Sequence, residues 1–163
     1  MQDIRWGIIG AGRIAGEYAA ALQLANGNRL AAVASRRSST AAALAARHPG
    51  ARAYGNASAL LEDPEVDAVY VATPHPQHAE WTIRALQAGK SVLCEKPLGV
   101  NHAEVMAMID AARERGCFLM EAFMYRCHPQ TMKLLELVAD GAIGELRHLE
   151  ASFGYDMAFD PAS

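Results

Sequence analysis

Residues 6–15 read WGIIGAGRIA, and this stretch decides the fold. Its apolar start fits a buried strand over residues 5–9, and the residues after the glycines favour a helix over residues 13–24. Gly10, Gly12 and Ala15 therefore have the G-x-G-x-x-G/A spacing of a dinucleotide-binding turn between a strand and a helix. In such a turn Gly10 permits the tight bend, Gly12 lets the backbone approach a pyrophosphate, and Ala15 keeps the helix close to the strand.

The first helical residues after the turn, Arg13 and Ile14, complete the candidate phosphate site. A helix N-terminus offers free N–H groups and a partial positive charge to an anion. The spacing alone is weak evidence, because the chain contains 13 glycines and the pattern arises readily by chance. Its place between the first strand and the first helix favours nucleotide binding over a turn that is only structural.

Short apolar segments alternate with helical ones as far as residue 122, which is the pattern of βαβ units on a parallel sheet. This pattern predicts an α/β fold, an NAD(P)-binding Rossmann domain with a doubly wound parallel sheet, over residues 1–122. The expected strands cover residues 5–9, 29–34, 53–54, 67–72, 91–94 and 118–122. The expected helices cover residues 13–24, 39–48, 57–62, 76–88 and 102–115, the last of them capped by Asn101.

The remaining residues, 123–163, have a different pattern. A helix is expected at about residues 130–140, then a turn over residues 141–144. Residues 146–155 alternate well enough to predict a strand. We interpret this part as the truncated start of an α+β substrate and dimerisation domain.

Composition excludes several classes of partner. The net charge is −3 at pH 7, and no basic cluster exceeds Arg36-Arg37, so a nucleic-acid partner is not expected. The chain shows no leader segment and no stretch of the ~18–20 apolar residues that a membrane helix needs, so we expect no membrane partner. Three cysteines without ligand-like spacing indicate reduced thiols, no metal site and a cytoplasmic location.

Ser35, Arg36 and Arg37 follow the second expected strand. An NAD site usually places Asp or Glu there, on the ribose 2′-hydroxyl, but no acidic residue occurs between Asn28 and Leu61. A hydroxyl and two guanidinium groups suit a 2′-phosphate instead. We therefore favour NADP as the cofactor, with NAD possible; the alternative is that both arginines are solvated loop residues.

Thr73, Pro74, His75 and His78 follow the fourth expected strand. The ends of such strands line the ligand crevice of doubly wound folds, so these four residues are candidate cofactor contacts. For either histidine, helix capping or a surface position is the alternative.

Five segments, taken in order, make a resemblance specific. They are GAGRIA at residues 10–15, SRR at 35–37, VATPHPQH at 71–78, AGKSVLCEKPLG at 88–99 and FLMEAFMYRCHP at 118–129. Their order resembles the glucose–fructose oxidoreductase/inositol dehydrogenase (Gfo/Idh/MocA) family, and within it the NADP-linked branch of dihydrodiol and aldose dehydrogenases. The resemblance implies a Rossmann domain followed by a larger, open antiparallel sheet that carries substrate contacts and a dimer interface.

The resemblance also implies roles for residues after the fifth expected strand. Lys96 matches the catalytic lysine of the family's E-K-P motif, and Glu95 and Pro97 match the neighbours that shape the nicotinamide pocket. The chemistry agrees, because a nearby ammonium can hold a substrate hydroxyl and stabilise the negative charge that develops as its proton leaves. A surface lysine after a strand is the alternative.

Tyr125, Arg126 and His128 match the segment that passes near the nicotinamide, so they are candidate substrate-lining residues, although His128 followed by proline reads equally well as a helix entry. Relatives are about twice as long, so we expect the partner of Lys96 to lie beyond residue 163 and this chain to turn over poorly. Homo-oligomers are expected for the full-length family.

The implied activity is hydride transfer between NADP and a CH–OH group of a small sugar, cyclitol or trans-dihydrodiol. Two alternatives remain: a non-catalytic NADP-binding sensor, and a nucleotide-sugar or amino-acid dehydrogenase of another Rossmann branch. Cys94 is a possible nucleophile, but no base or helix N-terminus is expected beside it, which favours a buried structural thiol.

Overall fold

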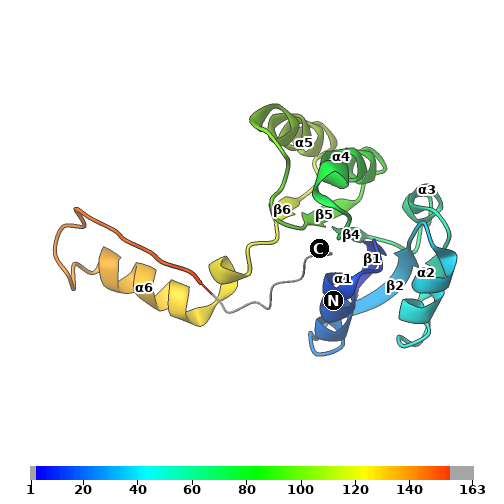
Figure 1. Cartoon of the computed structure of the whole chain (residues 1–163), viewed down its shortest axis with the longest axis horizontal. Coiled ribbons are helices and arrows are strands. Elements are labelled where there is room, and N and C mark those ends of the chain that lie inside the picture. Colours follow the sequence, from blue (N-terminus) through cyan, green and yellow to red (C-terminus); the bar gives the residue numbers. More distant parts are fainter. Residues whose placement is uncertain (1–2, 155–163) are drawn as a thin grey trace, which may run out of the picture. The chain divides into compact units, whose positions relative to one another are not determined.

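The computed structural model describes residues 3–154, and the chain divides after Phe123 into two compact units. The first unit alternates strands and helices (Figure 1). Its strands are β1 (Ile4–Ile9), β2 (Asn28–Ala34), β3 (Arg52–Tyr54), β4 (Ala68–Val71), β5 (Ser91–Cys94) and β6 (Leu119–Glu121). Its helices are α1 (Arg13–Leu22), α2 (Ser38–Ala45), α3 (Ala57–Leu61), the 3₁₀ turn η1 (His75–Gln77), α4 (His78–Gln87) and α5 (His102–Arg115).

All six strands form one parallel sheet in the order β3-β2-β1-β4-β5-β6. This is the strand order of the doubly wound Rossmann fold, so the predicted fold class is confirmed. The direction of winding reverses between β1 and β4, and at such a switch point the loops at the carboxyl ends of the strands leave a crevice for a ligand.

The core has two halves because side chains alternate between the faces of each strand. Ile8 of β1 and Tyr70 of β4 pack with α1 and α2, whereas Ile9 and Val69 pack with the helices on the opposite face. Figure 1 shows α4 and α5 on one side of the sheet and α1 and α2 on the other. With helices on both faces, the central strands read as continuous apolar runs, as expected for a parallel sheet.

The helix boundaries agree with the sequence predictions to within three residues, and α5 matches its predicted range at both ends. Asn101 caps α5 as expected, because its Oδ1 accepts the N–H of Glu104 at 2.9 Å, and Gly116 ends the helix at φ 61°. The main difference is at α4, where the first turn is the 3₁₀ segment η1 and the α-helix begins at His78. Pro74 and Pro76 lack N–H donors, so regular helical hydrogen bonding starts only after them.

The amino ends of the central strands are joined by charged groups. Arg5, at the start of β1, donates from Nε and Nη2 to the two carboxylate oxygens of Asp67 at 2.8 and 2.7 Å. Lys90 precedes β5 and is buried, and its Nζ donates to the carbonyls of Asp63 at 2.9 Å and Val66 at 2.7 Å. These contacts pin β1, β4 and β5 together at the end of the sheet away from the crevice.

The second unit contains η2 (Met124–Cys127) and α6 (Pro129–Ala139). The helix predicted at residues 130–140 is confirmed. The strand predicted at residues 146–155 is not: residues 146–154 belong to no strand, and Tyr155 lies outside the described residues. A strand needs a hydrogen-bonded neighbour, and its alternating pattern cannot supply that neighbour.

Candidate functional site

A cavity of about 800 Å³ opens in the first unit at the carboxyl ends of β1, β2 and β4. Its lining brings together seven of the residues singled out from the sequence: Gly10, Gly12, Ser35, Arg36, Arg37, Thr73 and Pro74. They come from three separate parts of the chain and meet because parallel strands end at the same edge of the sheet. The crevice predicted from the strand pattern is therefore present.

The two glycines of the turn serve different needs. Gly10 has φ +106°, and a Cβ built on it would lie 2.4 Å from the carbonyl oxygen of Ala72. Gly12 has an ordinary extended backbone at the start of α1, and a Cβ built on it would meet nothing within 4 Å. The structure therefore requires glycine at position 10 for folding, whereas the open space at Gly12 is where a pyrophosphate could approach the helix N-terminus, as predicted.

Ser35 is held at the end of β2 by its neighbours. Its N–H donates to the carbonyl of Tyr54 at 3.2 Å, and its Oγ accepts the hydroxyl of Thr40 at 2.9 Å and the N–H of Arg37 at 3.4 Å. Arg36 and Arg37 are exposed, and within residues 3–154 neither forms a salt bridge. Two unpaired guanidinium groups beside a fixed hydroxyl can bind a phosphate.

The cavity also contains residues that sequence reasoning missed. Thr40, Asn56, Gln77 and Trp81 line it. Gln77 and Trp81 stand one helical turn apart, and the guanidinium carbon of Arg84 lies 4.8 Å from the indole centroid. A polar and an aromatic residue at i, i+4 after the fourth strand could have indicated a lining face, but this spacing is equally common on surface helices.

The loop after β4 divides its residues between the surface and the interior. His75 is exposed, whereas His78 is fully buried. The Nε2 atom of His78 lies 2.9 Å from the carbonyl oxygen of Thr73, and its Nδ1 lies 2.8 Å from that of Pro97. Both nitrogens of the His78 ring are therefore engaged with backbone, and the ring does not line the cavity.

Lys96 lies on the loop that leaves β5, and its side chain is exposed. Its ammonium has no hydrogen-bond partner among the described residues, so it is available to a ligand. The loop around it is fixed: Glu95 accepts the hydroxyl of Tyr70 at 2.5 Å and the N–H of Lys96 at 3.1 Å, and Glu121 accepts the N–H of Leu98 at 2.8 Å. Burial raises the pKa of the Tyr70 phenol well above its usual range, so this hydroxyl remains a donor.

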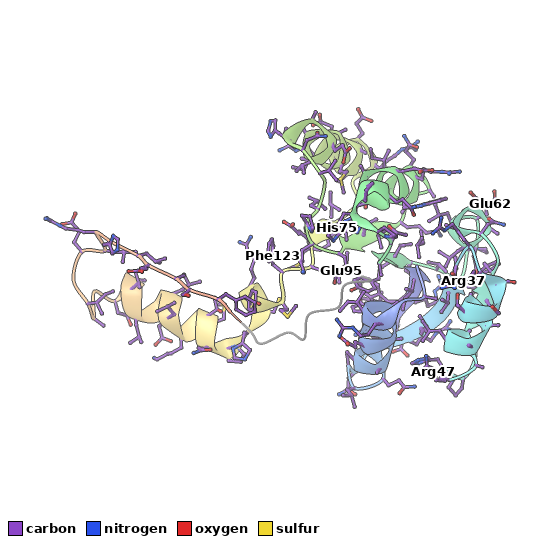
Figure 2. The ribbon with its side chains drawn as sticks, in the orientation of Figure 1. Arg37, Arg47, Glu62, His75, Glu95 and Phe123 are labelled. Atoms are coloured by element: carbon purple, nitrogen blue, oxygen red, sulfur yellow. The ribbon has the colours of Figure 1, made fainter. Side chains whose placement is uncertain are left out.

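Arg37 after β2 and Glu95 after β5 lie at separate places along the sheet (Figure 2). Two strands, β1 and β4, separate β2 from β5. An extended ligand with a phosphate at one end and a reactive group at the other could span this distance, and the glycine turn after β1 lies between its two ends.

Cys94 is fully buried at the end of β5. Burial raises the pKa of its thiol to about 11, so the thiolate form is scarce at neutral pH. The expectation of a structural thiol, not a nucleophile, is consistent with both observations.

Tyr125, Arg126 and His128 belong to the second unit, where all three are exposed. The Nδ1 of His128 accepts the N–H of Gln130 at 3.2 Å and so caps α6. The helix-entry interpretation of His128 is thus confirmed, and a role in lining a substrate site stays a prediction for all three.

Residues 3–154 contain neither a side-chain cluster suited to a metal ion nor a helix suited to a membrane. Within this part of the chain no cluster of three or more His, Cys, Asp or Glu side chains is placed to hold a metal ion. No helix in the same part is long and apolar enough to cross a membrane.

Comparison with known proteins gives matches at the levels of family, sequence and structure. The model of an oxidoreductase family with an NAD-binding Rossmann fold matches residues 4–123. The trans-1,2-dihydrobenzene-1,2-diol dehydrogenase of Macaca fascicularis is 43% identical over 160 residues, which are 97% of this chain and 48% of that protein. The human protein of the same name is 42% identical with the same coverage.

Among solved structures, the 3-ketoreductase KijD10 of Actinomadura kijaniata in complex with NADP is 43% identical, with a TM-score of 0.80. The match covers 88% of this chain and 46% of that one. A putative myo-inositol dehydrogenase from Sinorhizobium meliloti is 33% identical, with a TM-score of 0.79 over 87% of this chain and 43% of that one. The chain thus spans about half the length of the curated relatives it matches.

Proposed function

We propose a function from one premise: the chain belongs to the Gfo/Idh/MocA oxidoreductase family, whose model matches residues 4–123. On this premise the first unit is the NADP-binding part of a dehydrogenase. The whole protein transfers a hydride between the nicotinamide and a CH–OH carbon of a small sugar, cyclitol or trans-dihydrodiol. The residues at the ends of β1, β2, β4 and β5 hold the cofactor and the reacting hydroxyl.

The observation that carries the cofactor assignment is the group Ser35, Arg36 and Arg37 in the cavity of the glycine turn. Arg36 and Arg37 have no carboxylate partner within residues 3–154, and no acidic residue stands at the end of β2. Both features favour a ribose that carries a 2′-phosphate over one that carries a free 2′-hydroxyl. The 3-ketoreductase KijD10, which resembles this chain, was crystallised with NADP. NADP is therefore the proposed cofactor, and NAD the weaker ligand.

The remaining contacts follow the sheet. Gly10, Gly12, Arg13 and Ile14 would hold the pyrophosphate at the N-terminus of α1. Thr73, Pro74 and His75 would pass beside the nicotinamide half, together with Glu95 and Lys96. We now assign His78 to the framework behind these residues, because its ring nitrogens face two backbone carbonyls.

Lys96 is the proposed catalytic residue. Bound NADP supplies the hydride acceptor. The Lys96 ammonium donates to the substrate oxygen and stabilises the negative charge that develops on it. It takes up the hydroxyl proton only as it passes one of its own protons to the partner residue proposed in the domain after position 122. The hydroxyl of Tyr70 donates to Glu95, and Glu95 accepts the N–H of Lys96, so these contacts hold the backbone at Lys96 and leave its ammonium free to bind the substrate.

The residues after position 122 are proposed to begin an α+β domain that completes the substrate site and supplies the partner of Lys96, with Tyr125, Arg126 and His128 near the substrate. On this reading the 163-residue chain binds cofactor but turns over slowly, and the full-length protein is a homo-oligomer. Free thiols at Cys94 and Cys117 agree with a cytoplasmic location.

A fluorescence titration of this chain with NADPH and NADH tests the cofactor assignment. Wild type should prefer NADPH, and Lys96→Ala should keep that preference because its ammonium acts on the substrate. Arg36→Ala combined with Arg37→Ala should weaken NADPH about 10- to 100-fold, since a hydrogen bond to a charged group contributes about 1.5–3 kcal/mol. NADH binding should change little, and equal losses for both nucleotides would contradict a 2′-phosphate contact.

A further inference from the structure

The buried side chain of His78 contacts both the loop after β4 and the loop after β5, to which the proposed function gives different roles. His78, the first residue of α4, is fully buried, with its Nε2 2.9 Å from the carbonyl oxygen of Thr73 and its Nδ1 2.8 Å from that of Pro97. Both partners are carbonyl oxygens, which only accept, so the ring donates to both only when both of its nitrogens carry hydrogen. A neutral ring donates to one of the two carbonyls and lies in contact with the other. Residues 73 and 97 are joined through this ring although β4 and β5 hold them on different strands.

The two loops have different tasks. Thr73 lines the cavity together with the glycine turn. Pro97 directly follows Lys96, and the flanks of this loop are held separately, by Tyr70 through Glu95 and by Glu121 through the N–H of Leu98. Of the three residues that hold the Lys96 loop, Tyr70, Glu121 and His78, only His78 also contacts Thr73 in the loop after β4.

We propose that His78 is a positioning residue that sets the spacing between the cofactor loop at Thr73 and the catalytic loop at Lys96. This inference rests on the proposed function. The ring touches neither cofactor nor substrate; it acts by holding the two carbonyls at one distance, so that the nicotinamide enters a preformed gap. Without the His78 ring the two loops also adopt other spacings, which do not fit the nicotinamide. The apparent affinity for NADPH then falls in proportion to the fraction of molecules that keep the correct spacing.

The link should act on one half of the cofactor only. The sheet order places β2 and its arginines on one side of β1, and β4 and β5 on the other. The adenosine 2′-phosphate half lies over the glycine turn and the end of β2, which His78 does not contact. The nicotinamide half lies between the loops that it joins.

Two variants of the 163-residue chain each keep one arm of the link. The amide nitrogen of asparagine in His78→Asn takes roughly the place of Nδ1 and can still donate to the Pro97 carbonyl. The amide nitrogen of glutamine in His78→Gln takes roughly the place of Nε2 and can still donate to the Thr73 carbonyl. The matched control is His102→Gln, at the exposed start of α5.

Binding of NADPH and of adenosine 2′,5′-bisphosphate is measured by calorimetry. Both His78 variants should raise the Kd for NADPH about tenfold and leave the Kd for the bisphosphate within about twofold of wild type, and the control should change neither. A normal NADPH affinity in either variant overturns the link, because one arm then suffices. An equal loss for both ligands also overturns it, because His78 would then support the sheet as a whole. Failure of wild type to bind NADPH would overturn the proposed function itself, and the link with it.

Discussion

Replacing Gly12 with alanine should separate cofactor binding from folding, and replacing Gly10 should not. The backbone at Gly12 has φ −83° and ψ −173°, which any residue adopts, and an added Cβ meets no atom within 4 Å. At Gly10 the added Cβ would lie 2.4 Å from the carbonyl oxygen of Ala72 and 2.8 Å from its carbonyl carbon. Those atoms belong to the backbone that follows the central strand β4, so they cannot move aside cheaply.

The magnitudes follow from these geometries. Gly12→Ala loses a favourable N-cap residue but restricts the unfolded chain, so the net change in unfolding free energy should stay within about 1 kcal/mol. The new methyl group, however, occupies the space where a pyrophosphate would approach the N–H groups of α1, and NADPH affinity should fall about 10- to 100-fold. Gly10→Ala combines a left-handed backbone, at φ +106°, with the clash, and should cost about 3 kcal/mol or more of stability.

Thermal unfolding and NADPH titration of the two variants form the assay. For a chain of this length about 3 kcal/mol corresponds to a fall of about 6–12 °C in Tm, which we expect for Gly10→Ala alone. Gly12→Ala should melt close to wild type while losing NADPH. If Gly12→Ala binds NADPH normally, the pyrophosphate does not pass over this turn, and the cofactor placement is wrong.

Three further predictions concern stability and reactivity. The two side-chain hydrogen bonds from Arg5, together with its backbone N–H, lower the pKa of Asp67 to about 2. This contribution to stability is present above about pH 4 and is lost as the pH falls toward 2, so urea midpoints measured across that range should fall more steeply in wild type than in Asp67→Asn. Lys90→Met removes the ammonium from the carbonyls of Asp63 and Val66, and among the described residues only the Asp63 carbonyl keeps another donor, the N–H of Val66 at 3.2 Å. The free energy of unfolding should fall by about 1.5–3 kcal/mol, whereas an unchanged urea midpoint would show that water replaces the ammonium. A thiol reagent at neutral pH should modify the exposed Cys127 and spare Cys94 until the protein is denatured, and mass spectrometry of the digested protein would detect early modification of Cys94 if the interior is accessible.

The fold could be predicted because its signals are local. The apolar runs of the strands and the glycine spacing each depend on residues a few positions apart. Asn101 at one end of α5 and Gly116 at the other show the same, since each fixes a helix end through its immediate neighbours. Gly10 and Ser35 meet in one cavity because the strand order follows from the βαβ pattern.

The role of His78 could not be predicted, because it depends on contacts across 19 residues of sequence to Pro97. The sequence places His78 and His75 in the same loop and gives no sign that one is buried and the other exposed. Tyr70 reads simply as part of an apolar strand, and only the structure shows its hydroxyl against Glu95. The strand expected at residues 146–155 failed for a related reason: alternation describes the two faces of a strand but does not provide its neighbour.

Because the strands are parallel, the polar residues that hold the strands together lie at one end of the sheet, and the polar residues proposed for binding and catalysis lie at the other. Arg5, Asp67 and Lys90 join the strands where they begin, and the residues proposed for chemistry occupy the loops where the strands finish. A mutation in a loop at the carboxyl ends of the strands can therefore change ligand specificity without weakening the hydrogen bonds that hold the starts of the strands together. Proteins with this fold can therefore evolve new substrate specificities through their carboxyl-end loops while the contacts at the starts of their strands stay the same.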